Sequence, residues 1–217
     1  MVSLRWLLLI GIAWLWPTVG QAQPVPPTPR QLTVFDGLPS NTVNRMAEDG
    51  YGYLWIATND GLARYDGRNY RVWRAEDGLR DNHVWSVHVD ARNQLWIGTE
   101  NAGLAMMSAD RRELRFFDRA SHPQIGSNTI WSITSTADGT VWFGTYEGGL
   151  HRLDRDGKVT RFMPERGNPR SLPAASVTHL ATTRDGSLWV GTQAGLARWT
   201  GTDFERVPSR DVPAQVI

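Results

Sequence analysis

A four-residue motif that begins with tryptophan recurs four times and defines how this chain is organised. The Trp-to-Trp intervals are 41, 46 and 47 residues, and self-similarity at such a period indicates a propeller or a solenoid. A β-branched apolar residue stands twelve positions before each tryptophan, and a Gly-Leu pair follows six or seven positions after it. The motif copies are Trp55–Thr58, Trp96–Thr99, Trp142–Thr145 and Trp189–Thr192, and the recurring glycines are Gly61, Gly103, Gly149 and Gly195.

Each repeat divides into four short runs of strand-forming residues separated by turn signals. An Asp-Gly pair supplies the positive φ that a tight hairpin requires, and we place such pairs between the first and second runs and between the third and fourth. The pairs are Asp49-Gly50, Asp66-Gly67, Asp138-Gly139, Asp156-Gly157 and Asp185-Gly186. The 3.6-residue period of helical solenoids is absent, so the sequence predicts an all-β fold, a β-propeller of four-stranded antiparallel blades with four blade repeats present.

The register of the repeats sets the expected domain boundaries. We expect a signal peptide at 1–22, a Pro-rich linker at 23–30 and a β-propeller at 31–217. Residues 31–35 resemble the last strand of each later repeat and predict an outer strand, whereas residues 212–217 align with the opening of the fourth copy. The expected blade cores cover about 41–73, 82–117, 128–162 and 175–207.

The two partial repeats at the ends of the array predict an incomplete propeller. An outer strand at 31–35 would lack its first three strands, and 212–217 would start a further blade. We therefore expect the sequence to be a fragment of a longer ring. The alternative is a closed four-bladed ring, in which the outer strand pairs with the unfinished blade.

The N-terminal residues read as a secretory signal. Arg5 supplies a basic start, Leu7 to Trp16 form an apolar run, and Gly20-Gln21-Ala22 end in small residues suited to cleavage before Gln23. The run is short for a membrane span, and an uncleaved anchor is the alternative. Export of a chain without cysteine suits a bacterial periplasm, where disulfides are permitted but not required.

Composition excludes several classes of function. Outside the signal segment, 22 basic side chains balance 22 acidic ones, so no basic field attracts nucleic acid or anionic lipid. The absence of cysteine excludes disulfides, a thiol nucleophile and thiolate metal sites. The five histidines show no metal-ligand spacing, and no glycine loop that cradles phosphate is followed by a helix. We therefore expect neither a cofactor nor a metal.

Packing accounts for the four motif tryptophans. A flat four-stranded blade has two apolar faces that must each be buried, and one large aromatic side chain per blade fills the gap to its neighbour. The glycine or alanine two residues later leaves room for that neighbour. We expect Trp55, Trp96, Trp142 and Trp189 to be core residues, and function to lie in what differs between the copies.

The motifs together resemble a known family. The first copy reads Asp36-Gly37-Leu38-Pro39-Ser40-Asn41-Thr42-Val43, then Asp49-Gly50-Tyr51-Gly52-Tyr53-Leu54-Trp55-Ile56-Ala57-Thr58, then Asp60-Gly61-Leu62-Ala63-Arg64-Tyr65-Asp66-Gly67. This pattern resembles the two-component regulator propeller repeat, and the resemblance runs from about Leu32 to Ile217. It implies the periplasmic sensor region of a bacterial membrane receptor, usually with two seven-bladed propellers, a small β-sandwich, a transmembrane helix, and a cytoplasmic histidine kinase or diguanylate cyclase.

The resemblance also implies a ligand. Members of the family often respond to polysaccharides or oligosaccharides, so we expect periplasmic ligand sensing, with carbohydrate as the ligand and a homodimer as the state of the full-length receptor. We expect no catalytic domain within these residues. A secreted carbohydrate-binding or scaffold propeller is the alternative. A glycosidase is a third reading, because residues 135–142 are similar to the Asp-box hairpin of sialidases, but no arginine triad or tyrosine nucleophile can be placed.

Strand parity places the candidate ligand residues on one face. The turns after each motif threonine lie opposite the tight Asp-Gly hairpins and carry residues that vary between copies. Trp85 and Trp131 join them, because the equivalent positions hold Asn44 and Thr178 and the fold does not require an aromatic there. Turn chemistry and packing between blades compete with a ligand as explanations. The candidates are Asn59, Asp60, Trp85, Glu100, Asn101, Trp131, Tyr146, Glu147 and Gln193.

Overall fold

The computed structural model describes residue 29 and residues 31–207. The predicted signal peptide at 1–22, most of the linker at 23–30 and the further blade at 212–217 therefore lie outside the described residues. Contacts divide the chain after Gln31, and the unit from Leu32 onward holds all the regular structure that is described. In the part of the chain that the structure describes, no helix has the length and apolar character needed to cross a membrane.

The regular structure consists of four antiparallel sheets of four strands, which we call blades 1 to 4. Blade 1 contains β1 (Val43–Glu48), β2 (Leu54–Thr58), β3 (Gly61–Tyr65) and β4 (Tyr70–Trp73). Blade 2 contains β5 (Val84–Val89), β6 (Leu95–Thr99), β7 (Leu104–Met107) and β8 (Leu114–Phe117). Blade 3 contains β9 (Ile130–Ser135), β10 (Val141–Thr145), β11 (Gly149–Leu153) and β12 (Val159–Phe162), and blade 4 contains β13 (Val177–Thr182), β14 (Leu188–Thr192), β15 (Gly195–Trp199) and β16 (Phe204–Val207).

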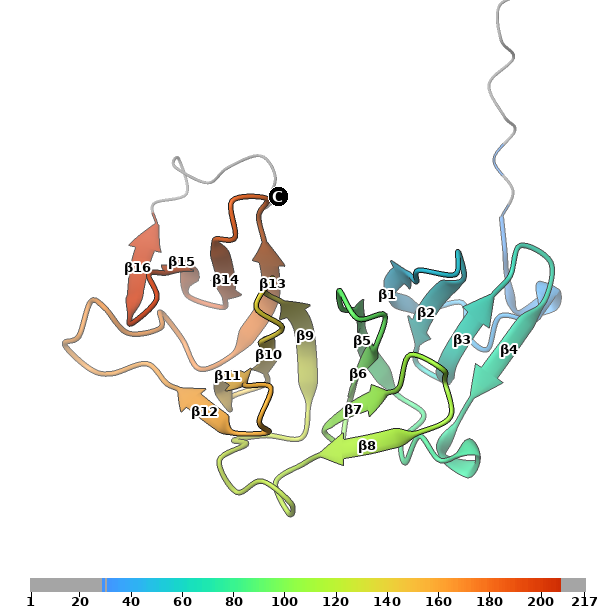
Figure 1. Cartoon of the computed structure of the whole chain (residues 1–217), viewed down its shortest axis with the longest axis horizontal. Coiled ribbons are helices and arrows are strands. Elements are labelled where there is room, and N and C mark those ends of the chain that lie inside the picture. Colours follow the sequence, from blue (N-terminus) through green and yellow to red (C-terminus); the bar gives the residue numbers. More distant parts are fainter. Residues whose placement is uncertain (1–28, 30, 208–217) are drawn as a thin grey trace, which may run out of the picture. The chain divides into compact units, whose positions relative to one another are not determined.

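The blades follow one another in chain order, and the first strand of each is innermost (Figure 1). The inner strands contact one another in sequence: β1 lies against β5, β5 against β9, and β9 against β13. In every blade the strands pair in the order first to fourth, and each neighbouring pair is antiparallel. The prediction of an all-β propeller with four-stranded antiparallel blades is confirmed.

A tryptophan from one blade packs against the inner strands of the next. Trp55 is fully buried in a cluster that includes Val84 and Ile97 of blade 2. The clusters around Trp96 and Trp142 repeat this arrangement with blades 3 and 4, and Trp189 of blade 4 is also buried. Burying an aromatic side chain of 150–250 Å² stabilises the fold by about 4–6 kcal/mol. The prediction that the four motif tryptophans are core residues is confirmed.

In blades 2 and 3, the neighbouring blade requires the glycine that stands two residues after the motif tryptophan. A methyl group on Gly98 would lie 2.6 Å from the carbonyl oxygen of Ile130, and one on Gly144 would lie 2.4 Å from Cγ1 of Val177. Both contacts come from the inner strand of the next blade. At Gly191 of blade 4, a methyl group would meet only His179 of the same blade, at 3.3 Å or more.

The outer strand predicted at 31–35 is not formed, and this prediction was wrong. Val34–Asp36 instead form a 3-10 helix, η1, which is followed by Gly37 at φ +103°. The Thr33 hydroxyl accepts a hydrogen bond from the Phe35 N–H, and the Asp36 carboxylate accepts one from the Thr33 N–H. The same turn recurs as η2 (Ala75–Asp77) after β4. The sequence match therefore belonged to the turn that follows an outer strand.

The first Asp-Gly turn also differs from its predicted form. The residue with positive φ in this hairpin is Gly52, at +82°, and Gly50 has no positive φ. The Asp49 N–H donates to the carbonyl of Tyr53 and the Gly52 N–H to that of Asp49, so the turn is closed two residues later than the dipeptide suggested. Asn93 occupies the equivalent place in blade 2 at φ +60°.

Blade 3 contains a buried histidine that the fold keeps neutral. His151 on β11 is fully buried, stacks on Phe143 with ring centroids 4.8 Å apart, and accepts a hydrogen bond from the Gly126 N–H through Nε2. Burial lowers the pKa of His151 to about 4, and the nearby charge of Arg161 contributes in the same direction. A proton on this ring would therefore weaken the folded state.

We predict that Gly98→Ala destabilises the 217-residue chain by about 1–3 kcal/mol, because the added methyl group meets a backbone oxygen that cannot move aside. Urea unfolding measures this loss. Gly191→Ala is the matched control and should change the free energy of unfolding by less than about 0.5 kcal/mol. Equal effects of the two substitutions would contradict the packing described.

We predict that the free energy of unfolding falls as the pH drops from 6.5 towards 4, because the unfolded chain takes up a proton on His151 and the folded chain does not. A difference of about 2.5 pKa units corresponds to about 3 kcal/mol. This loss of stability is absent above pH 6.5 and reaches its full size below pH 4. Subtracting the curve of His151→Gln isolates it, and parallel curves over this range would refute the assignment.

Candidate functional site

The first strand of every blade carries a β-bulge at its second residue. In β5, Val84 pairs with Thr99 and Ser86 pairs with Gly98, so Trp85 is the extra residue. The same register shift occurs in the other inner strands, where the extra residues are Asn44, Trp131 and Thr178. A bulge bends the strand and re-aims a side chain, and such bulges are over-represented next to functional sites. This explains why the position varies between copies.

In blades 1 to 3 the bulged side chain contacts the residue that follows the motif threonine. Asn44 Nδ2 donates to Asn59 Oδ1 at 2.9 Å. The Trp85 indole N–H donates to the Glu100 carboxylate. The rings of Trp131 and Tyr146 lie with their centroids 5.0 Å apart. Sequence positions about 15 residues apart therefore form one pair per blade, on the face opposite the tight hairpins.

The pairs of blades 2 and 3 join into one group, which we call the aromatic cluster: His83, Trp85, Glu100, Trp131 and Tyr146. Trp85 and Trp131 meet edge to face, with centroids 6.4 Å apart and an interplanar angle of 70°. The His83 ring stacks on Trp85, with ring centroids 4.6 Å apart. The two tryptophans are half-buried and Tyr146 is exposed. Four of the predicted ligand residues thus lie together.

Backbone hydrogen bonds fix the loops that carry the aromatic cluster. The Glu100 N–H donates to the carbonyl of His83 at 3.0 Å, and the Tyr146 N–H donates to that of Thr129 at 3.1 Å. The Thr129 hydroxyl donates to the Glu100 carbonyl at 2.7 Å and so connects blade 3 to blade 2. The cluster therefore sits on a rigid support that spans two blades.

His83 was considered in the sequence only as a poor metal ligand, and its place in the cluster was missed. Its position two residues before Trp85 was the available signal, since alternate residues of an extended strand share a face. Its Nε2 atom is buried and has no hydrogen-bond partner among residues 31–207. In the same residues, no group of three or more His, Asp or Glu side chains is placed to hold a metal ion.

The other predicted ligand residues lie outside the aromatic cluster. Asp60 of blade 1 forms an ion pair with Arg74 at 3.1 Å, and Asn59 is held by Asn44. Asn101 and Glu147 follow cluster residues directly and are exposed, and Gln193 is exposed on blade 4. Glu147 has φ +54°, which is consistent with the turn chemistry that competes with a ligand at these positions.

The asparagines at the entry to three blades close the links between blades. Their side-chain oxygens accept backbone N–H groups of the preceding turn: Asn41 from Val34, Asn82 from Ala75 and Asn128 from Arg119, at 2.8–3.0 Å. In the link before blade 4, the Ser171 hydroxyl accepts a hydrogen bond from the Glu165 N–H in a similar way. These amides are therefore occupied by the chain itself.

Comparison with known families matches the four repeats one by one. The model of the "two component regulator propeller" family matches residues 37–60, 78–101, 124–147 and 171–194, each of which covers an entry link, an inner strand and the motif tryptophan. The chain carries four two-component regulator propeller repeats. The two matched segments in blades 2 and 3 together include every residue of the aromatic cluster.

The relatives include a histidine kinase and extracellular domains of two-component systems. Histidine kinase P4 of Formosa agariphila is 36% identical over 45 residues, which is 21% of this chain and 3% of that protein. Two crystal structures of extracellular domains, from proteins assigned as hybrid two-component systems of B. thetaiotaomicron, share the fold with TM-scores of 0.70 and 0.62 at 24% and 23% identity. They cover 83% and 81% of this chain, which spans only about a quarter of their length.

We predict that Trp131→Thr, which installs the residue of blade 4, lowers the free energy of unfolding by only about 1 kcal/mol, because the bulge frees this side chain from the blade core. Trp142→Thr, on the neighbouring strand, should cost about 3–5 kcal/mol because it leaves a cavity between blades 3 and 4. Chemical unfolding of both variants tests this, and a comparable loss for the two would show that Trp131 is a core residue.

Proposed function

We propose that this chain is the ligand-sensing propeller region of a bacterial signal-transduction receptor, that it acts outside the cytoplasm, and that the aromatic cluster binds carbohydrate. One observation carries the proposal. The bulges of blades 2 and 3 hold Trp85 and Trp131 beside Tyr146 and Glu100, on the loop face and without a role in the blade cores.

The chemistry of the cluster suits a sugar ring. A pyranose has an apolar face of C–H groups, which packs on an aromatic ring, and a rim of hydroxyl groups, which needs charged or polar partners. Trp131 and Tyr146 offer aromatic faces, and Tyr146 is 43% exposed. The Glu100 carboxylate accepts the indole N–H of Trp85 and can accept further hydrogen bonds from ligand hydroxyl groups. His83 Nε2 has no hydrogen-bond partner in the described residues and could bond to a ligand hydroxyl.

Binding at this place would couple two blades. The cluster takes residues from blades 2 and 3, and the Thr129 hydroxyl already links their loops. A ligand that contacts both blades favours whichever relative packing suits it, and the size of the shift is limited by the ligand's differential affinity for the two states. In the proposed receptor, this bias passes to membrane-proximal parts that lie outside this chain.

The comparisons support the cellular setting of the proposal. The four family repeats and the likeness to extracellular domains of two-component systems support an exported, periplasmic location and a membrane-anchored parent protein. The expected partners are an oligosaccharide ligand and, in the full-length receptor, a second copy. We propose a binding role without catalysis for these residues, because the aromatic cluster contains only one carboxylate, and glycoside hydrolysis commonly uses two.

We predict that Tyr146→Ala weakens oligosaccharide binding by about tenfold, because it removes the exposed aromatic face of the cluster. Calorimetric titration of the chain against a panel of neutral and acidic oligosaccharides measures this. Tyr51→Ala is the matched control, since Tyr51 is also an exposed tyrosine and lies on the tight-hairpin face. It should bind as the parent does. Absence of heat with every sugar, or equal losses in both variants, would refute the carbohydrate proposal.

A further inference from the structure

On the tight-hairpin face, an arginine fills the junction between blades 1 and 2. Arg111, in the hairpin between β7 and β8, has φ +62°, and its guanidinium lies 5.3 Å from the ring centroid of Trp55. Its Nη2 atom donates to Asp49 Oδ2 at 2.8 Å, and the Asp49 side chain is fully buried. The chain thus supplies its own occupant above this motif tryptophan.

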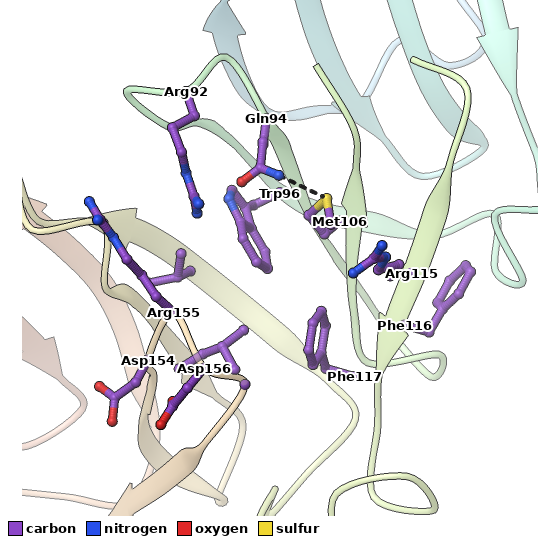
Figure 2. A pocket seen from close by; sticks show the side chains of 14 residues that line it. Arg92, Gln94, Trp96, Met106, Arg115, Phe116, Phe117, Asp154, Arg155 and Asp156 are labelled. Carbon is purple, nitrogen blue, oxygen red and sulfur yellow. Dashed lines mark hydrogen bonds between the residues drawn. The ribbon is translucent and has the colours of Figure 1, made fainter. Parts of the chain in front are cut away.

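The same place between blades 2 and 3 is open. In the hairpin between β11 and β12, Gly157 takes the position of Arg111, with φ +86° and the same N–H donation to the first residue of the turn. Gly157 supplies no side chain at this position, and a cavity of about 380 Å³ lies over Trp96 (Figure 2). Met106, Phe117 and Val141 complete an apolar lining. This volume is typical of small-molecule pockets.

Three guanidinium groups surround this apolar lining. Arg92 and Arg155 extend toward the same opening from blades 2 and 3, and Arg115 lines it from β8 (Figure 2). Arg155 crosses Gly139 so closely that a methyl group there would lie 2.4 Å from its Nε. Hydrogen bonds from Thr136 and Thr140 and the nearby charge of Arg155 lower the pKa of Asp138. The contact of Arg115 with Glu113 is an exposed pair at 3.5 Å, and such pairs contribute little.

The carboxylates near the cavity are already engaged. Asp154 pairs with Arg152 at 3.0 Å, and Asp156 accepts the Lys158 N–H at 3.1 Å. Both carboxylates point away from the opening in Figure 2. Asp90 is buried, accepts the Trp96 indole N–H at 3.0 Å and lies 3.9 Å from Arg92. The open side of the cavity therefore presents the guanidinium groups of Arg92 and Arg155 beside the ring of Trp96.

We propose that this cavity binds an aromatic carboxylate, with its ring against Trp96 and Phe117 and its carboxylate between Arg92 and Arg155. Guanidinium groups bind carboxylates through charge-assisted hydrogen bonds, and the apolar lining accepts the ring. Gln94 also lines the cavity, and its buried Oε1 atom accepts no hydrogen bond from the described residues. It can therefore accept a ring N–H. An indole carboxylate combines these three features.

Calorimetric titration of the full chain with indole-3-acetate tests the proposal. We expect saturable binding that weakens about tenfold in Arg155→Gln and in Arg92→Gln, because each variant removes one charged hydrogen-bond donor. Indole-3-acetamide, the neutral analogue, should bind about tenfold more weakly than the acid. Arg112→Gln is the control, because Arg112 is a highly exposed arginine of the neighbouring hairpin and does not line the cavity. It should leave the affinity unchanged.

A variant that fills the cavity gives a second test. Gly157→Arg places an arginine where blade 2 has Arg111, and a Cβ at this position meets no atom within 4 Å. We expect it to fold, because Arg111 already adopts this backbone conformation, and to lose binding of indole-3-acetate. Trp131→Thr, in the aromatic cluster, should retain that binding.

Four results would overturn the proposal. Three of them are no saturable binding of indole-3-acetate, equal affinity for the acid and the amide, and binding that survives in Arg155→Gln, Arg92→Gln and Gly157→Arg alike. Tighter binding of tryptamine, the cationic analogue, would also overturn it, since it would show that the buried Asp90 rather than the arginines governs the site.

Discussion

Burial of one tryptophan between each pair of adjacent blades is the interaction on which the rest of the structure depends. A single four-stranded sheet leaves both faces exposed, and Trp55, Trp96 and Trp142 each close one face against the next blade's inner strand. The spacing is tight enough that Gly98 and Gly144 cannot carry a methyl group. The blade is therefore stable only as part of an array, which is why the repeat is so regular at these positions.

Two kinds of position escape this constraint, and they lie on opposite faces. The bulged residue of the inner strand points away from the blade core, so it can be Asn, Trp or Thr without loss of packing. The residue with positive φ in the hairpin between the third and fourth strands lies above the motif tryptophan of the preceding blade. It is Arg111 in blade 2 and Gly157 in blade 3. The first variation forms the aromatic cluster, and the second decides whether a junction is filled or hollow.

The repeat arithmetic predicted the four-stranded blades and the buried tryptophans, because both follow from periodicity and apolar packing. The prediction was wrong where it relied on a short sequence match without considering hydrogen bonds within the turn. Residues 31–35 were aligned with a strand, although Thr33 and Asp36 cap a turn, and Gly50 was given the role that Gly52 performs. Four of the five residues of the aromatic cluster were predicted from positions that vary between the repeats, such as Trp85, whereas His83 was missed because its environment arises from a neighbouring ring.

The sequence by itself determined the fold class, the register of the blades and the face on which variable loops gather, since a repeat fixes strand order and strand parity. Tertiary structure decided which of these variable residues meet. Trp85 and Trp131 are 46 residues apart and belong to different blades, and only the packing of β5 against β9 brings them together. The cavity over Trp96 likewise depends on strands and hairpins of blades 2 and 3 that no linear motif connects.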